Sequence, residues 1–196
     1  MKEIAVILVG TVLVNNFVLS RFLGICPFLG VSKNLNSAVG MSTAVIFVMM
    51  MATAATWPIY NYILLPNYAY MQTIVFILVI ATLVQLVEIV LKRYIPSLHR
   101  SLGIYLPLIT TNCAVLAITL LNIDEGYNFL QSIINAFGAG LGFLLAMVLF
   151  TGVRGRMEGA AEIPRAFRGI PITLTAAAIV AVAFMGFAGV IEGLFV

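Results

Sequence analysis

The sequence predicts an all-α integral membrane protein whose six transmembrane helices form two inverted three-helix repeats, with the first and fourth helices broken. Its composition is the first observation: 63% of the 196 residues are hydrophobic and 9% are charged, far from the composition of an average soluble domain. The second is that charges and helix breakers divide the chain into six apolar stretches. The third is that both cysteines stand beside residues that interrupt helices.

Six spans fit the chain because a helix needs roughly 20 apolar residues to cross about 30 Å of hydrocarbon. The predicted spans cover residues 4–22, 38–60, 70–91, 101–121, 129–151 and 170–193. The connections between them are short, so we expect a single membrane domain of residues 1–196. Any catalytic head is expected to belong to another chain.

Basic residues predict the orientation, because cytoplasmic loops retain Lys and Arg. The other side carries Lys2 and the acidic turn at Asp124 and Glu125, while aromatic residues gather at the outer end of the second and third spans. We therefore expect a multi-pass protein with both termini outside, whose net charge of +3 marks topology and not a nucleic-acid surface. The cytoplasmic set is Lys33, Lys92, Arg93, Arg100, Arg154, Arg156, Arg165 and Arg168.

If the six spans divide as three plus three, the second half must be inverted relative to the first, because each half crosses the membrane an odd number of times. We place repeat one at about residues 1–95 and repeat two at about residues 96–196. Each half opens with a hydrophobic stretch that carries Gly or Pro, Asn and one Cys. Interrupted helices at corresponding positions of inverted repeats indicate a functional centre near the bilayer midplane.

Helix breakers flank both cysteines. Pro27 disfavours helix at Cys26, and Gly24 and Gly30 allow backbone angles that other residues resist. In the fourth span Pro107 has the same effect, and a polar run before Cys113 can satisfy freed backbone groups: Thr110, Thr111 and Asn112. Unwound backbone persists in a membrane where it is buried in protein or lines a cavity. Each cysteine is therefore expected at an elbow where helix ends supply amide donors that favour thiolate.

Three interpretations of the two cysteines remain open from the residues themselves. They form a disulfide, they are unrelated buried small hydrophobes, or they hold a metal centre. An all-cysteine [2Fe-2S] cluster needs four thiolates, and this chain has two cysteines. A cluster would therefore take its other two ligands from a second copy or from a homologous partner chain.

Long stretches around both cysteines resemble the family of A-type membrane subunits of the Rnf complex. That family shares its fold with the E-type membrane subunit of the sodium-pumping NADH:quinone reductase. The resemblance covers essentially the whole chain. The segments that carry it are residues 14–19 (VNNFVL), 23–33 (LGICPFLGVSK) and 106–116 (LPLITTNCAVL).

The resemblance implies a subunit of a redox-driven translocase in the bacterial or archaeal cytoplasmic (inner) membrane, not catalytic alone. Such a complex moves electrons between ferredoxin and NAD and couples this to sodium or proton transport. The A-type subunit would pair with the paralogous, oppositely oriented E-type subunit of the Rnf complex, and the pair would share a [2Fe-2S] cluster. Cys26 and Cys113 would be the iron ligands from this chain. Other Rnf subunits with iron–sulfur clusters and flavins would be further partners.

Further residues receive weaker assignments. Gly24, Pro27, Thr110, Thr111 and Asn112 would surround the cluster, where their polar groups tune it or simply satisfy the broken backbone. The basic rim of residues 154–168 is a candidate dock for an acidic partner, and the glycines of residues 138–142 predict close helix contact, which we assign to the partner protein. The alternative functions are a cofactor-free secondary transporter or an assembly subunit. Since no carboxylate cluster marks an ion site, the sequence does not choose between sodium and proton.

Overall fold

The computed structural model describes residues 8, 10–14, 16–32, 34–65, 68–94, 106–158, 164 and 169–186, and these residues contain helices and no strands. The first half carries η1 (Gly10–Val14), α2 (Ile25–Val31), α3 (Leu35–Ile59), η2 (Tyr60–Leu64), η3 (Ala69–Met71) and α4 (Gln72–Tyr94). The second half carries α6 (Leu106–Thr110), α7 (Cys113–Asp124), α8 (Phe129–Glu158) and α9 (Ile170–Met185).

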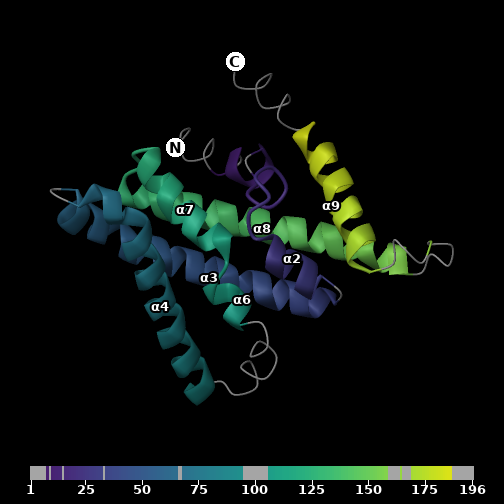
Figure 1. Ribbon diagram of the computed structural model, residues 1–196, viewed down its shortest axis with the longest axis horizontal. Helices are drawn as coiled ribbons and strands as arrows, with labels where there is room; N and C mark the ends of the chain where they lie inside the picture. The colour runs from purple at the N-terminus through teal and green to yellow at the C-terminus, as the bar shows by residue number, and fades with distance from the viewer. Residues whose placement is uncertain are drawn as a thin grey trace.

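Helices α3 and α8 lie side by side in opposite directions and form the centre of the molecule (Figure 1). Glycines on α8 permit this close approach, since a Cβ built at Gly140 would lie 2.6 Å from Cγ1 of Ile46 in α3. Gly138 and Gly142 likewise face η1 and the residues next to it. The predicted close contact at the glycines is therefore confirmed, but it is made inside this chain and not to a partner.

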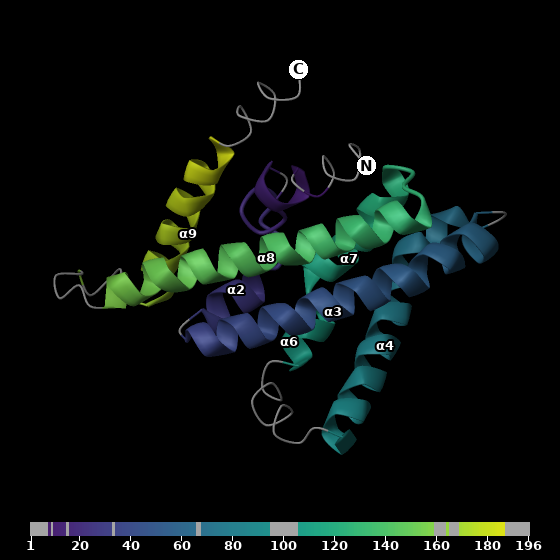
Figure 2. The same ribbon diagram turned by 180° about the vertical axis from the view of Figure 1, so that it is seen from behind.

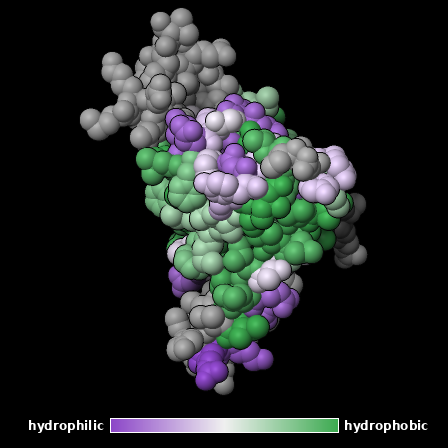
Figure 3. All heavy atoms as spheres, turned by 90° about the vertical axis from the view of Figure 1, so that its left-hand side faces the viewer, coloured by the Kyte–Doolittle hydropathy of each residue, from purple (hydrophilic) through white to green (hydrophobic). Residues whose placement is uncertain are grey.

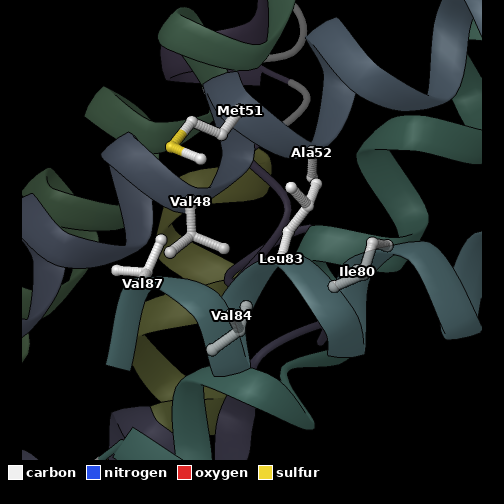
Figure 4. Close-up of a pocket in the computed structure, with 7 residues that line it drawn as sticks. All are labelled: Val48, Met51, Ala52, Ile80, Leu83, Val84 and Val87. Carbon is white, nitrogen blue, oxygen red and sulfur yellow. The ribbon is translucent and has the colours of Figure 1, made fainter. Parts of the chain in front are cut away.

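The outer helices α4 and α9 expose many large apolar side chains. Helix α4 packs its aliphatic residues Ile80, Leu83 and Val84 against Val48 and Ala52 of α3 (Figure 4). Viewed from behind, α4 and α9 extend away from the central pair on different sides (Figure 2). Exposed hydrophobic residues follow both helices, and hydrophobic residues form a broad area across the face in Figure 3. A surface of this kind is suited to lipid or to further membrane helices.

Three helical stretches among the described residues are long and apolar enough to cross a membrane: Leu35–Leu64, Gln72–Ile89 and Phe129–Met157. They correspond to the predicted second, third and fifth spans. Two shorter apolar helices cover Leu108–Asp124 and Ile170–Met185, within the predicted fourth and sixth spans. The all-helical membrane character is thus confirmed, while the arrangement as six helices in two inverted repeats stays a prediction.

The first helix is broken, but earlier in the chain than the sequence predicted. Helical structure in η1 ends at Val14, and the backbone between Asn16 and Gly24 is irregular. Phe22 has φ of 56° and Gly24 has φ of 80°, a left-handed conformation that costs a non-glycine residue roughly 1–2 kcal/mol. The predicted continuous span of residues 4–22 is therefore wrong in its second half, because the backbone from Asn16 onward forms turns, and the left-handed Phe22 and Gly24 keep helix from resuming before α2.

The prolines do not make the breaks. Pro27 is the third residue of α2 and Pro107 is the second residue of α6, so both lie in the first turn of a helix, where a missing N–H costs no hydrogen bond. Cys26, directly before Pro27, is helical, which contradicts the prediction that Pro27 disfavours helix there. In the fourth span the break falls at Thr111 and Asn112, between α6 and α7.

Candidate functional site

Both cysteines lie at the start of a helix that follows a break. Cys26 is the second residue of α2 and Cys113 is the first residue of α7. Both side chains are exposed on the isolated chain, and neither is in a disulfide. The expected elbow positions are therefore present, whereas the interpretation as buried small hydrophobes is wrong for both residues and a disulfide is not formed.

A hydrogen bond joins the two broken segments. The backbone N–H of Gly24 donates to Sγ of Cys113 over 2.9 Å, and α2 also contacts α6. Gly24 is the N-cap of α2, two residues before Cys26. The residue that ends the first break thus contacts the cysteine that follows the second break, so the structure places the start of both cysteine-bearing helices in one region.

Gly24 is closely surrounded. A Cβ at this position would lie 3.1 Å from Oδ1 of Asn112, 3.2 Å from Cβ of Ala114 and 3.2 Å from Cε2 of Phe143. Both its left-handed φ and its packing therefore require glycine. Because Phe143 belongs to α8, the two breaks meet against the central helix.

Asn112 ends the second break by capping α7. Its side-chain Oδ1 accepts a hydrogen bond from the backbone N–H of Ala114 at 3.1 Å, the usual role of an N-cap asparagine. The side chain is 4% exposed, and its Nδ2 has no hydrogen-bond partner among the described residues. A buried amide donor of this kind lies directly beside Cys113 in the chain.

The other residues predicted around the cysteines have different surroundings. Pro27 is buried in the first turn of α2, Thr110 is half-buried at the end of α6 and Thr111 is exposed in the break. Asn16 shapes the first break: its Oδ1 accepts from the backbone N–H of Val18, and its Nδ2 donates to the carbonyl of Gly142 on α8. Asn15 and His99 lie outside the described residues.

Arg154 has a role that the sequence analysis missed. Its guanidinium donates to the carbonyl of Leu29 at 2.7 Å and to Oγ of Ser32 at 2.9 Å, at the C-terminal end of α2. A positive charge at this end of a helix is favourable because carbonyl groups there have no intrahelical partner. Arg154 therefore anchors the Cys26 helix to α8, while a dock for an acidic partner at the basic rim of residues 154–168 stays a prediction.

No group of three or more His, Cys, Asp or Glu residues that could hold a metal ion occurs among the described residues. This chain has two cysteines in all. Their donor set fits one half of an all-cysteine iron–sulfur site, since Sγ of Cys113 already accepts an amide hydrogen bond of the kind that surrounds cluster sulfurs.

A second polar feature was missed entirely. Oγ1 of Thr11 donates to Oδ1 of Asn135 at 2.7 Å, and Nδ2 of Asn135 donates to Oδ1 of Asn122 at 2.7 Å. All three side chains are buried. Asn135 within the predicted fifth span and Asn122 directly after the predicted fourth span were the signal that could have found it, because such residues in membrane segments mark packing or transport functions.

Comparison with known proteins agrees with the membrane fold. The family described as "Rnf-Nqr subunit, membrane protein" matches residues 4–191. The A-type subunit of an ion-translocating oxidoreductase complex from Syntrophotalea carbinolica is 56% identical over 98% of this chain and 100% of that protein. The A-type subunit of the Na(+)-translocating ferredoxin:NAD(+) oxidoreductase complex of Acetobacterium woodii is 57% identical over 93% of this chain and 95% of that protein. This chain therefore belongs to the Rnf-Nqr family of membrane subunits.

Proposed function

We propose that this chain is an electron-relay subunit of an Rnf-type complex, in which Cys26 and Cys113 provide two of the four ligands of an intramembrane [2Fe-2S] cluster. The observation that carries the proposal is the hydrogen bond from Gly24 to Cys113, which brings the starts of the two cysteine-bearing helices together. A shared cluster requires thiolates from another chain. The partner that we propose is the paralogous, oppositely oriented E-type subunit of the same complex.

Exposure of the cysteines supports a shared site. Both thiols lie at the surface of the isolated chain, in a protein whose described surface is otherwise rich in large apolar side chains. A partner membrane protein seated over this region would remove both sulfurs from lipid and bring its own cysteines to them. Gly24 and Asn112, which lie next to the proposed cluster site, are already held in place by packing within this chain.

The names of the relatives supply the context. One relative belongs to an ion-translocating oxidoreductase complex, and another belongs to a Na(+)-translocating ferredoxin:NAD(+) oxidoreductase complex. We extend this context to the present chain as one subunit, not catalytic alone, of a complex in the bacterial cytoplasmic membrane. Its further partners would be Rnf subunits with iron–sulfur clusters and flavins, and electron flow would be coupled to sodium or proton transport. Both chain termini would face outward.

Within this function the described residues hold and orient the ligands. The Gly24 amide fixes the Sγ atom of Cys113, and Arg154 anchors the end of the helix that carries Cys26. A bound [2Fe-2S] cluster supplies a one-electron carrier within the membrane. Phe28 and Phe150, whose ring centroids are 4.2 Å apart, pack the Cys26 helix against α8.

The experiment is electron paramagnetic resonance of the dithionite-reduced complex, purified without oxygen, with iron and sulfide quantification. We expect a [2Fe-2S] signal that is lost in both Cys26→Ala and Cys113→Ala complexes while assembly is retained. Thr43→Ala is the matched control, since this exposed helix residue bonds its own backbone at Val39 and its replacement should leave the signal intact.

Other results would favour the competing functions. An assembled, iron-free parent complex would contradict the proposal. Ion transport that survives replacement of both cysteines would favour a cofactor-free secondary transporter, because broken helices also build transport sites. Normal assembly with no redox defect in the double cysteine variant would favour an assembly subunit.

A further inference from the structure

Helix α4 has one packed face and one exposed face. Phe76, Ile80 and Val84 are buried, and the last two line the contact with α3 (Figure 4). At 3.6 residues per turn, the opposite face is a stripe of exposed residues that we call the α4 seam. The proposed electron relay uses none of them. The α4 seam consists of Ile74, Leu78, Thr82, Gln85, Ile89 and Lys92.

The spacing of the α4 seam is that of helices that pack side by side. From Leu78 to Lys92 its residues follow one another at intervals of four, three, four and three positions. This is the heptad spacing that keeps one stripe of a helix against a partner helix, and most membrane bundles pack in this way. A face turned to lipid would also be exposed, so the chemistry at the centre of the seam decides between the two.

Gln85 is a polar residue at the centre of this seam. It lies within the apolar stretch Gln72–Ile89, two helical turns or about 10 Å before Lys92. Its side chain is exposed and makes no hydrogen bond to any residue that the structure describes. A primary amide has two N–H donors and an oxygen acceptor, and lipid tails satisfy none of them. Exposure of Gln85 to lipid would therefore be costly.

Exposed threonines in the long helices differ from Gln85. Oγ1 of Thr82 donates to the carbonyl of Leu78 at 2.8 Å, and Oγ1 of Thr43 in α3 donates to the carbonyl of Val39 at 2.9 Å. A hydroxyl that bonds a carbonyl of its own helix is already satisfied and can face lipid. The Gln85 amide has no such bond within α4, so it indicates a hydrogen-bonding partner outside this chain.

The charges of α4 indicate what kind of chain this partner is. The last turn of the helix is basic, with Lys92 and Arg93. Two copies of this chain, packed through the α4 seam in the same orientation, would bring these basic turns together, and like charges repel. A helix from a different chain avoids this repulsion. The relatives carry the name of a complex subunit, so other subunits are available as partners.

We propose that the α4 seam packs against a transmembrane helix of another subunit of the complex, and that this helix presents an amide or hydroxyl side chain to Gln85. A polar residue in an otherwise apolar seam fixes the register of the two helices. Gln85 would thus set the depth at which the partner helix lies. The identification of the partner as a subunit of the same complex rests on the proposed function, whereas the helix contact rests on the residues of α4.

The test uses the intact complex in detergent and measures, in a dilution series, the dissociation constant between this chain and each other membrane subunit. We expect Gln85→Leu to raise one of these constants about threefold, the average effect of a hydrogen bond between membrane helices. Gln85→Asn keeps an amide and should raise it less. Thr82→Val is the matched control, because it has nearly the same shape, lies one turn away in the seam and removes a hydroxyl that its own helix already satisfies. It should leave every constant unchanged.

Photo-cross-linking identifies the partner. A benzophenone amino acid at position 78 or 89 of the intact complex should give an adduct with a different membrane subunit, which mass spectrometry of the adduct identifies. An adduct between two copies of this chain would overturn the proposal in favour of a homodimer. Adducts confined to lipid at both positions would overturn it in favour of a lipid-facing helix, as would a Gln85→Leu complex that is as tight as the parent or tighter, since leucine suits lipid better than an amide.

The iron–sulfur signal keeps this proposal separate from the proposed function. An iron-free parent complex that still gives the adduct would contradict the electron relay and leave the α4 contact in place. A parent with the [2Fe-2S] signal but with adducts to lipid alone would support the relay and overturn the α4 contact.

Discussion

The backbone N–H of Gly24 donates a hydrogen bond of 2.9 Å to Sγ of Cys113, a residue 89 positions away. The bond connects the N-cap of α2 with the first residue of α7. Hydrogen bonds to cysteine sulfur tune iron–sulfur centres. Displacement of Gly24 should therefore affect both the packing of the two breaks and the environment of the Cys113 sulfur.

Gly24→Ala should destabilise the complex and perturb the site. A left-handed alanine costs roughly 1–2 kcal/mol, and its Cβ would approach Asn112, Ala114 and Phe143 at 3.1–3.2 Å. We expect a lower thermal midpoint and an altered [2Fe-2S] spectrum. The matched control is Gly30→Ala in the same helix, where a Cβ meets no atom within 4 Å and the change should be neutral or stabilising by about 0.5–1 kcal/mol. Equal effects of the two substitutions would contradict this account.

The sequence predicted a break before each cysteine-bearing helix and named Gly24 and Asn112 among the residues there, but it placed the first break too late in the chain and gave the prolines a role that they do not have. Proline is conspicuous in a sequence, yet Pro27 and Pro107 occupy first turns, where helices tolerate proline. The breaks arise at Gly24, whose φ is 80°, and at Asn112, which caps α7. A glycine permits several conformations, so its left-handed state follows from tertiary packing that the local sequence does not contain.

The sequence also did not predict which polar residues far apart in the chain contact each other. In the sequence Arg154 looks like any other basic residue near a helix end, and its contact with Leu29 joins residues 125 positions apart. Thr11 and Asn135 are separated by 124 positions. The apolar periodicity of single helices does not specify which polar residues of different helices meet. The composition was therefore enough to predict a membrane protein, whereas the polar contacts could be identified only from the folded structure.

Arg154→Gln should loosen the helix that carries Cys26. The substitution removes charge-assisted hydrogen bonds to Leu29 and Ser32, which are typically worth about 1.5–3 kcal/mol. We expect a lower thermal midpoint and fewer cluster spins per complex. Arg156→Gln is the control, because Arg156 is exposed in the same helix and its replacement should have little effect. Indistinguishable spin counts for the parent and Arg154→Gln would show that this anchor does not support the site.

Two substitutions of Asn112 distinguish its role as the N-cap of α7 from a role of its unpaired side-chain N–H groups. Asn112→Ala removes the cap of α7 and should cost about 1 kcal/mol, whereas Asn112→Ser keeps a capping oxygen and removes Nδ2. Because Nδ2 is buried without an acceptor among the described residues, we expect it to donate toward sulfur in the assembled site. Asn112→Ser should then lower the reduction potential of the cluster with little loss of stability. A potential equal to that of the parent, measured by redox titration, would assign Asn112 to capping alone.

The raised pKa of Tyr127, just beyond the C-terminal end of α7, predicts that the stability of the protein depends on pH. Burial raises the pKa of its phenol, and the nearby Glu125 carboxylate raises this pKa further. A raised pKa means that the folded protein favours the neutral phenol, so this stabilisation is complete below the ordinary value of about 10 and is lost as the pH rises through the folded pKa. Tyr127→Phe should therefore lose less stability than the parent between about pH 9 and 11, measured as the difference in thermal midpoint. Glu125→Gln removes only the smaller, electrostatic contribution to the raised pKa of Tyr127, so this variant should lose an intermediate amount of stability over the same pH range. Parallel pH profiles for all three proteins would contradict the prediction, because they would show that the phenol is equally ionised in the folded and unfolded states.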